Sequence, residues 1–502
     1  MASTTAPVVT DTTAAVDLTL HTSSPNRDQS QDKENCAPFY QSLADRIKER
    51  SRRTTPTNYI TPVTTTMQPK QVPSPAPQKS RPAKRPAPAE QDTARKPARR
   101  QKVFKDEDNG VREDARATAL PTTVPNDVRP LNDPAGNRDF VNQVLKGLKQ
   151  ELKPEPLCHG DRQNGRMHYL LTESRPANGE EMLFLSGAEA AAKLQPGVFH
   201  NGPILTEGQQ PLPLQTVQDF LDEHYDDDAK VWIQDQGVTY ASNKRPVRQV
   251  PIRQVKNRML VDNGKAKSKV KAKAKGKVWS WNCLELATHV EDGLRPTFLN
   301  GEDTRLLTKL KLEQATGYAG RRSYPEGYKE VEKWALLAEA GANTEPHQDS
   351  HGFSTYITAN QGRIGFGWLS NPTPEERKSW TKNPASIPGD RYRYVVLKEG
   401  QTVYFPAGTV HFVFRLPSAG HTLAFGGHVL RCSNIVHWAK TMLEERSNSQ
   451  ITNEDLTSSA PGYLNRVEKF VLQAQKNGSL EKWGGAGEVE EFLRLKEEFM
   501  ET

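Results

Sequence analysis

Short apolar segments bounded by turn residues dominate the chain between about residues 280 and 430. They are rich in β-branched and aromatic residues, and Gly, Pro, Asn or Asp flanks most of them, which is typical of β-strands. Many closely spaced strands favour a barrel or a double-sheet jelly roll over a doubly wound sheet. The expected strands lie within 281–286, 332–340, 353–361, 364–369, 391–397, 401–408, 411–416 and 422–430.

Helices are expected on both sides of this strand-rich region. An apolar helical face begins shortly after Asn137, a residue type suited to capping a helix. The expected class is therefore α+β, mainly β, with flanking helices. The other expected elements are this first helix with Phe140, Val141, Val144, Leu145 and Leu148, strands within 167–174 and 181–187, a helix with Val217, Phe220 and Leu221, a strand at 231–233, and C-terminal helices with Leu464, Val467, Phe470 and Val471 and with Val489, Phe492, Leu493, Phe499 and Met500.

The first part of the chain has a different composition. Residues 1–135 are rich in Pro, Thr, Ser, Ala and basic residues, and their apolar positions are too sparse to offset the entropy of ordering. We therefore expect a long disordered N-terminal tail. The predicted organisation is this tail, an extension at 136–278 that buttresses the core, a central domain at 279–445 and a helical segment at 446–502.

Basic residues are concentrated in two places on a chain whose formal net charge is +7. Lys84 and Arg85 are followed, after a spacer, by a second cluster at 95–102, the arrangement of a bipartite nuclear localisation signal. This arrangement predicts a nuclear protein that binds an import receptor. The basic tail could also bind nucleic acid. The lysine-rich loop at 264–277 is interpreted either as a solvated insertion or as a contact with nucleic acid or an acidic surface.

Cysteine usage and hydropathy exclude several classes of protein. The four cysteines are scattered, with no pair spaced as in a zinc module and no dense disulfide pattern. The first residues do not resemble a signal peptide, and no apolar run reaches the roughly 18 residues of a membrane span. We expect a protein of a reducing compartment that is neither secreted nor embedded in a membrane.

A candidate metal site joins two distant parts of the strand-rich region. His347 and Asp349 are separated by one residue, and His411 follows 62 residues after Asp349, where a Pro-Ala-Gly turn leads into a strand. Facing strands of a jelly roll would bring the three side chains together. Two imidazoles and one carboxylate form a facial triad that suits Fe(II) and leaves coordination positions open.

These motifs resemble the JmjC domain of the 2-oxoglutarate oxygenases, a double-stranded β-helix (jelly roll, cupin-like) fold. The similarity extends to the branch of JmjC histone lysine demethylases that elsewhere carries F-box or PHD-finger modules, here without a PHD finger. Trp281-Asn282, the segment 295–297 and Thr344 match features of that branch. The resemblance spans about residues 210–440 and is strongest from 344 to 435.

The resemblance implies roles for individual residues. His347, Asp349 and His411 would bind Fe(II) and form the catalytic centre, and Thr344 and Asn282 would help to hold 2-oxoglutarate. The implied reaction is hydroxylation of an N-methyl group on lysine, in histones or another basic protein, with release of formaldehyde. Two alternatives stay open: a protein or RNA hydroxylase that uses the same centre, and a catalytically weak JmjC scaffold on chromatin.

One position departs from the family pattern. The lysine that pairs with the cosubstrate lies 17 residues after the first histidine, and this chain has Ile364 there. Arg363 is adjacent, but strand alternation predicts that it points to the opposite face. Arg415 lies four residues after His411, so it should share that ligand's face and could pair with a carboxylate. We predict Arg415 as the replacement; the alternative is that it pairs with a nearby acid.

Overall fold

A computed structural model describes residues 131–239, 246–260, 279–286, 288, 290, 293–315, 331–384, 389–452 and 459–501. Nearly all of the predicted tail, both basic clusters and the lysine-rich loop lie outside the described residues. Within the described part, no helix combines the length and the apolar composition that crossing a membrane requires.

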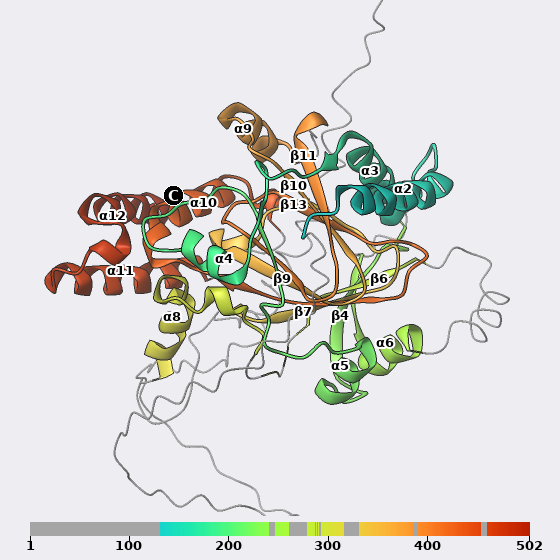
Figure 1. Ribbon diagram of the computed structural model, residues 1–502, viewed down its shortest axis with the longest axis horizontal. Helices are drawn as coiled ribbons and strands as arrows, with labels where there is room; N and C mark the ends of the chain where they lie inside the picture. Colours follow the sequence, from blue (N-terminus) through green and yellow to red (C-terminus); the bar gives the residue numbers. More distant parts are fainter. Residues whose placement is uncertain are drawn as a thin grey trace, which may run out of the picture. The chain divides into compact units, whose positions relative to one another are not determined.

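Two β-sheets form the centre of the described structure, which is of mixed α/β type (Figure 1). The predicted strand-rich region supplies most of their strands. The five-stranded sheet has the order β1 (Arg175–Pro176), β11 (Tyr392–Leu397), β10 (Ile364–Leu369), β13 (His411–Phe414) and β8 (Thr344–His347). The nine-stranded sheet has the order β2 (Leu183–Phe184), β3 (Ile204–Glu207), β12 (Gln401–Phe405), β9 (Ser354–Gln361), β14 (Thr422–Val429), β7 (Trp334–Ala338), β6 (Trp281–Leu286), β4 (Lys230–Asp235) and β5 (Val247–Pro251).

The inner faces of the two sheets share one apolar cluster. Phe366 and Val413 from the five-stranded sheet pack with Ile357, Val403 and Phe405 from the nine-stranded sheet, and all five are nearly inaccessible to solvent. Because side chains alternate between the faces of a strand, the neighbours of these residues point outward. The outward residues need a second layer to cover them, and the helices supply it.

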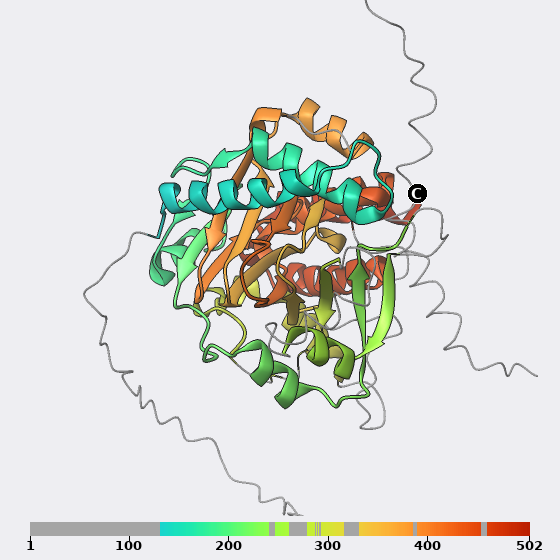
Figure 2. The ribbon, with the colours of Figure 1, turned by 90° about the vertical axis from the view of Figure 1, so that its right-hand side faces the viewer.

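The outer face of the five-stranded sheet is covered by α2 (Pro134–Glu151) and α3 (His159–Glu173), which run along one side of the fold in Figure 2. The strand predicted at 167–174 is wrong: it is part of α3, because Met167, Leu170 and Leu171 recur with helical spacing and bury one helix face. The predicted cap is wrong too. Asp133 caps α2, and Asn137 is buried, where its side chain accepts the Val396 N–H.

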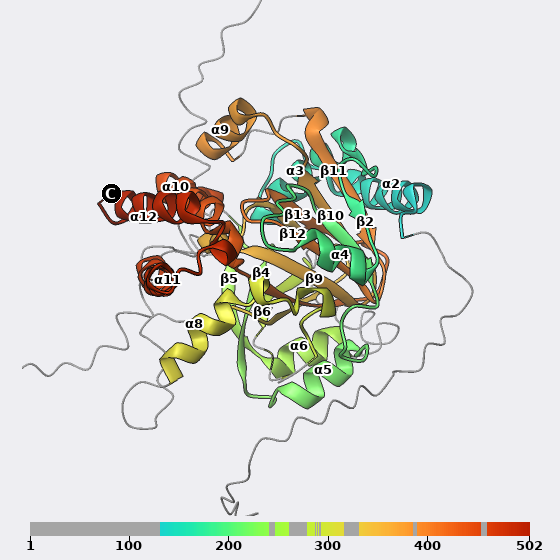
Figure 3. The same cartoon turned by 60° about the vertical axis from the view of Figure 1, so that its left-hand side comes forward.

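The remaining helices cover the other sheet and build a separate apolar cluster. Figure 3 shows α5 (Val217–His224) and α6 (Ile252–Met259) together at one end of the nine-stranded sheet. The predicted C-terminal helices are confirmed. They pack with α8 and α10 around Phe353 and Leu430, in a cluster that contains α8 (Leu306–Ala315), α10 (Ile435–Ser447), α11 (Ala460–Lys476) and α12 (Ala486–Glu501). Trp380 of α9 (Pro374–Lys382) joins the apolar cluster of α2 and α3, and α4 (Gly187–Lys193) packs against β3 and β12.

Small residues on β10 make room for aromatic rings of β13. A Cβ atom added at Gly365 would overlap the Phe414 ring, which packs under α2. Gly365→Ala is therefore expected to lower the free energy of unfolding by about 1 to 3 kcal/mol, measured by urea denaturation. Gly165→Ala is the control, because a Cβ there meets no atom within 4 Å. Equal stability of the two variants would contradict this packing.

Candidate metal centre

Antiparallel pairing of β8 with β13 brings the two distant histidines together. His347 is the register partner of His411, and their ring centroids are 4.3 Å apart. Both side chains are buried. The proximity that the sequence motif requires is therefore set by the backbone register of two strands.

Backbone carbonyls orient both imidazole rings. His347 Nδ1 lies 2.9 Å from the Glu345 carbonyl oxygen, and His411 Nδ1 lies 3.0 Å from that of Thr409. A carbonyl only accepts, so each Nδ1 carries the hydrogen and each Nε2 keeps its lone pair. Metal-binding histidines commonly have this arrangement, because the hydrogen bond at one nitrogen fixes the tautomer at the other.

Asp349 completes the cluster. Its Oδ1 lies 3.8 Å from Nε2 of His347 and 3.8 Å from Nε2 of His411. Its Oδ2 accepts the Thr355 hydroxyl hydrogen, and the Thr355 oxygen in turn lies 2.9 Å from His428 Nδ1. One carboxylate oxygen is thus held by the protein, while the other faces both imidazoles.

The three donor atoms fit a divalent metal. Among the described residues, His347, Asp349 and His411 form a group of potential metal ligands whose donor atoms all lie within 4.8 Å of one another. Burial, followed by the neighbouring His411, lowers the pKa of His347, which favours the neutral ring that a metal requires. Burial works to raise the pKa of Asp349, but His411, His428 and His347 lower it below its usual value, which favours the carboxylate.

The predicted cosubstrate residues line the space between the two sheets. Asn282 of β6 donates from Nδ2 to the Thr344 hydroxyl of β8 at 3.3 Å, a contact that joins the two sheets. Asn282 is fully buried, and its Oδ1 has no hydrogen-bond partner among the described residues. A buried amide oxygen without a partner is costly, so a ligand that donates or relays a hydrogen bond would fit here.

Arg415 lies in the same layer. Arg415 comes directly after β13, and alternation puts its side chain on the same face as that of Val413. Its Nε donates to the Thr422 hydroxyl of β14 at 2.7 Å. Thr422 and Asn282 are both register partners of Ala338, so they occupy one row across the nine-stranded sheet. The structure thus brings Arg415 and the Asn282–Thr344 pair to one interlayer space, although they come from distant parts of the sequence.

The charge of Arg415 has no acidic counterpart among the described residues. Its side chain is 2% exposed, and burial alone lowers its pKa to about 10, with no carboxylate opposing that effect. Besides Thr422, it bonds only the Ala342 carbonyl oxygen in this part of the chain, at 3.3 Å. The alternative that Arg415 pairs with a nearby acid is therefore not supported. An unpaired buried guanidinium is expected to bind an anion.

Ile364, which stands where the family pattern has lysine, and the adjacent Arg363 point to opposite faces of the sheet, as strand alternation predicts. Ile364 is buried between the sheets with Phe366 and Val413. Arg363 points the other way, with its guanidinium 4.8 Å above the Phe140 ring of α2. Arg363 is therefore a natural control for Arg415.

Several residues that surround the centre carry no local sequence signal. Gln348 lies between the first two ligands, and its side chain contacts Arg377 of α9 and Glu445 of α10. In sequence, Arg377 and Glu445 look like ordinary charged positions of surface helices. Only the tertiary structure identifies them.

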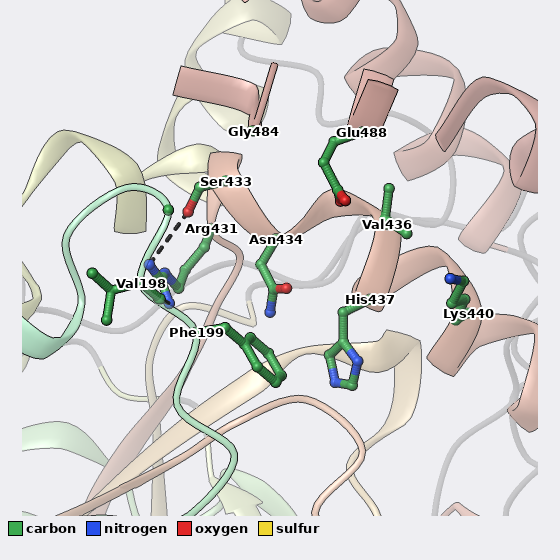
Figure 4. Close-up of a pocket in the computed structure, with 11 residues that line it drawn as sticks. Val198, Phe199, Arg431, Ser433, Asn434, Val436, His437, Lys440, Gly484 and Glu488 are labelled. Atoms are coloured by element: carbon green, nitrogen blue, oxygen red, sulfur yellow. Dashed lines mark hydrogen bonds between the residues drawn. The ribbon is translucent and has the colours of Figure 1, made fainter. Parts of the chain in front are cut away.

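A surface cavity of about 450 Å³ lies beside α10 (Figure 4). The Phe199 and His437 rings line it and meet edge to face, with centroids 5.1 Å apart. His437 Nε2 donates to the Ala407 carbonyl at 3.1 Å, and Ala407 belongs to the turn that precedes His411. The cavity therefore borders the backbone that leads to the third ligand.

A comparison with known proteins found a partial match to a lysine-specific demethylase. No protein-family model matches the chain. Lysine-specific demethylase 2B of Mus musculus is 29% identical over 136 residues, which cover 25% of this chain and 10% of that protein. The matched segment thus spans about a tenth of the length of this curated relative. This similarity supports a relationship to a lysine-specific demethylase over that segment.

Proposed function

We propose that the protein is an Fe(II)- and 2-oxoglutarate-dependent dioxygenase of JmjC type that acts on N-methyl-lysine in histones or another basic protein. The observation that carries the proposal is the convergence of two correctly oriented Nε2 atoms and one Asp349 oxygen. The proposal includes a double-stranded β-helix core, because two sheets that share one interior would enclose such a centre.

The residues divide into two groups by role. His347, Asp349 and His411 would hold the metal through one face of its coordination sphere. Thr344 and Asn282 would bind the cosubstrate, and Arg415 would pair with its carboxylate. When bound, Fe(II) and 2-oxoglutarate supply oxidation of a C–H bond by O₂, and an N-methyl group hydroxylated in this way leaves as formaldehyde.

The buried charge of Arg415 would suit one carboxylate of a dicarboxylate. Two of the five N–H donors of Arg415 bond within the described residues, and both acceptors are neutral. A carboxylate would supply the missing charge. The apolar residues between the sheets, such as Phe366 and Val413, would exclude water and strengthen the ion pair.

Partners and location form part of the proposal. The basic tail and the lysine-rich loop would contact chromatin, and the two basic clusters would bind a nuclear import receptor. The likeness to a lysine-specific demethylase supports a place in the nucleus.

The test is formaldehyde release from a panel of methylated histone peptides incubated with the full chain, Fe(II), ascorbate and 2-oxoglutarate. We expect formaldehyde and succinate in equal amounts with at least one methylated peptide and no formaldehyde with its unmethylated counterpart. A product heavier by one oxygen, without formaldehyde, would instead indicate a hydroxylase. Failure to convert 2-oxoglutarate with any peptide or alone would favour the scaffold.

A further inference from the structure

The loop that carries Asp349 is held from one side by α10. Glu445 is fully buried there, and its carboxylate accepts the N–H groups of His351 at 2.8 Å and Gly352 at 2.9 Å. Trp438, also of α10, donates its indole N–H to the His351 carbonyl at 2.7 Å. His351 has a φ of 63°, which non-glycine residues rarely adopt. Its surroundings must therefore maintain this conformation.

Gln348 extends this support to the position between the first two ligands. Its side-chain amide donates to Glu445 at 3.1 Å, and its side-chain oxygen accepts from Arg377. Its backbone N–H donates to the Ile451 carbonyl at 2.9 Å. Gln348 is fully buried, so a shift of this residue would leave several polar groups without partners.

Arg377 of α9 connects the same network to the other ligand-bearing turn. Its Nη1 donates to the Gly408 carbonyl at 2.5 Å. Gly408 adjoins Thr409, whose carbonyl orients the His411 ring. Glu444 accepts two further bonds from Arg377, at 3.2 and 2.8 Å, and balances its charge. One connected set of hydrogen bonds therefore reaches both halves of the metal centre.

We propose that Gln348, Arg377, Glu444 and Glu445, which we name the loop clamp, position the metal ligands. Glu445 and Arg377 would act as positioning residues, because each holds the backbone beside a ligand and neither contacts the metal. The inference rests on the metal site of the proposed function. Groups that orient metal ligands from behind typically change metal affinity by about 10- to 100-fold when they are lost.

Glu445→Gln tests the clamp with almost no change in volume. An amide cannot accept at both ends, so at least one of the three N–H bonds at Glu445 would be lost. We expect Co(II) to bind the full-length variant about 10- to 100-fold more weakly, with an altered visible absorption spectrum of the bound Co(II). Asp303→Asn is the matched control, because Asp303 is a buried carboxylate that bonds Arg431 and Ser433, neither of which belongs to the two loops.

Arg377→Lys is a second variant, in case Glu445→Gln does not fold. Arg377 is partly exposed, and lysine keeps its charge but cannot reach Gln348, Gly408 and Glu444 together. We expect the same weakening of Co(II) binding. Wild-type affinity and spectrum in both variants would overturn the clamp, as would an equal loss of Co(II) affinity in Asp303→Asn.

Hydrogen exchange on the metal-free chain separates this inference from the proposed function. Both variants are expected to speed amide exchange in the peptides 345–354 and 406–412, which contain the two loops, whereas Asp303→Asn leaves them unchanged. A wild-type chain that bound no Co(II) would remove the proposed function, yet these exchange rates would still decide on the clamp. Unchanged exchange in both loops would overturn it.

Discussion

His347→Ala is expected to abolish the conversion of 2-oxoglutarate to succinate. The substitution removes one of three donor atoms from a buried cluster and leaves the other two without a complete facial set. Loss of a residue that merely orients a ligand costs about 10- to 100-fold in metal affinity, so loss of a ligand should cost more than about 100-fold. The measurements are succinate formation without added peptide and Fe(II) binding under anaerobic conditions.

His168→Ala is the control for that experiment. His168 is a partly exposed histidine of α3, outside the metal cluster. The His168→Ala substitution should leave both succinate formation and Fe(II) affinity at the wild-type level. Identical succinate rates in wild type and His347→Ala would remove the enzyme interpretation and leave the scaffold.

Arg415→Met is expected to weaken 2-oxoglutarate binding by about a hundredfold or more, because breaking a buried charge pair costs about 3 to 5 kcal/mol. Methionine keeps an extended side chain but removes the charge. Since Arg415 has no acidic partner among the described residues, its removal should not lower the melting temperature of the ligand-free chain by much. Calorimetric titration with 2-oxoglutarate, together with thermal unfolding, checks both expectations.

Arg363→Met provides the matched comparison, because Arg363 lies one residue from Ile364 but points to the outer face of its sheet. It should bind 2-oxoglutarate with the wild-type affinity. If the two variants change the affinity equally, Arg415 does not anchor the cosubstrate. A large fall in melting temperature with unchanged affinity would give Arg415 a purely structural role.

The local parts of the site could be predicted from the sequence. The His-x-Asp spacing and the turn before His411 are short motifs, and alternation along β13 correctly predicted the side on which Arg415 lies. Strands such as β10 and β11 were predictable because each is a short, mainly apolar run bounded by turn residues. These properties depend on neighbours within a few positions.

Other parts depend on contacts between distant residues and were missed. The segment 167–174 has strand-forming residues, but its apolar positions follow a helical period, and packing against β11 and β13 favours the helix. Glu445 has the type of a solvent-exposed residue and is nevertheless fully buried. Its burial depends on the amides of a loop more than 90 residues away, which no local pattern contains.

The backbone contact between Gln348 and Ile451 limits how far the chain can be shortened. A fragment that ended at residue 445 would keep all three candidate ligands and would lose the carbonyl that the Gln348 N–H bonds, along with the bridge to Thr452. Such a fragment would contain the three ligand side chains, but the loop that carries two of them would lack its backbone contacts with Ile451 and Thr452. Recombinant versions intended for metal or cosubstrate studies should therefore extend through residue 452 and the helices that follow.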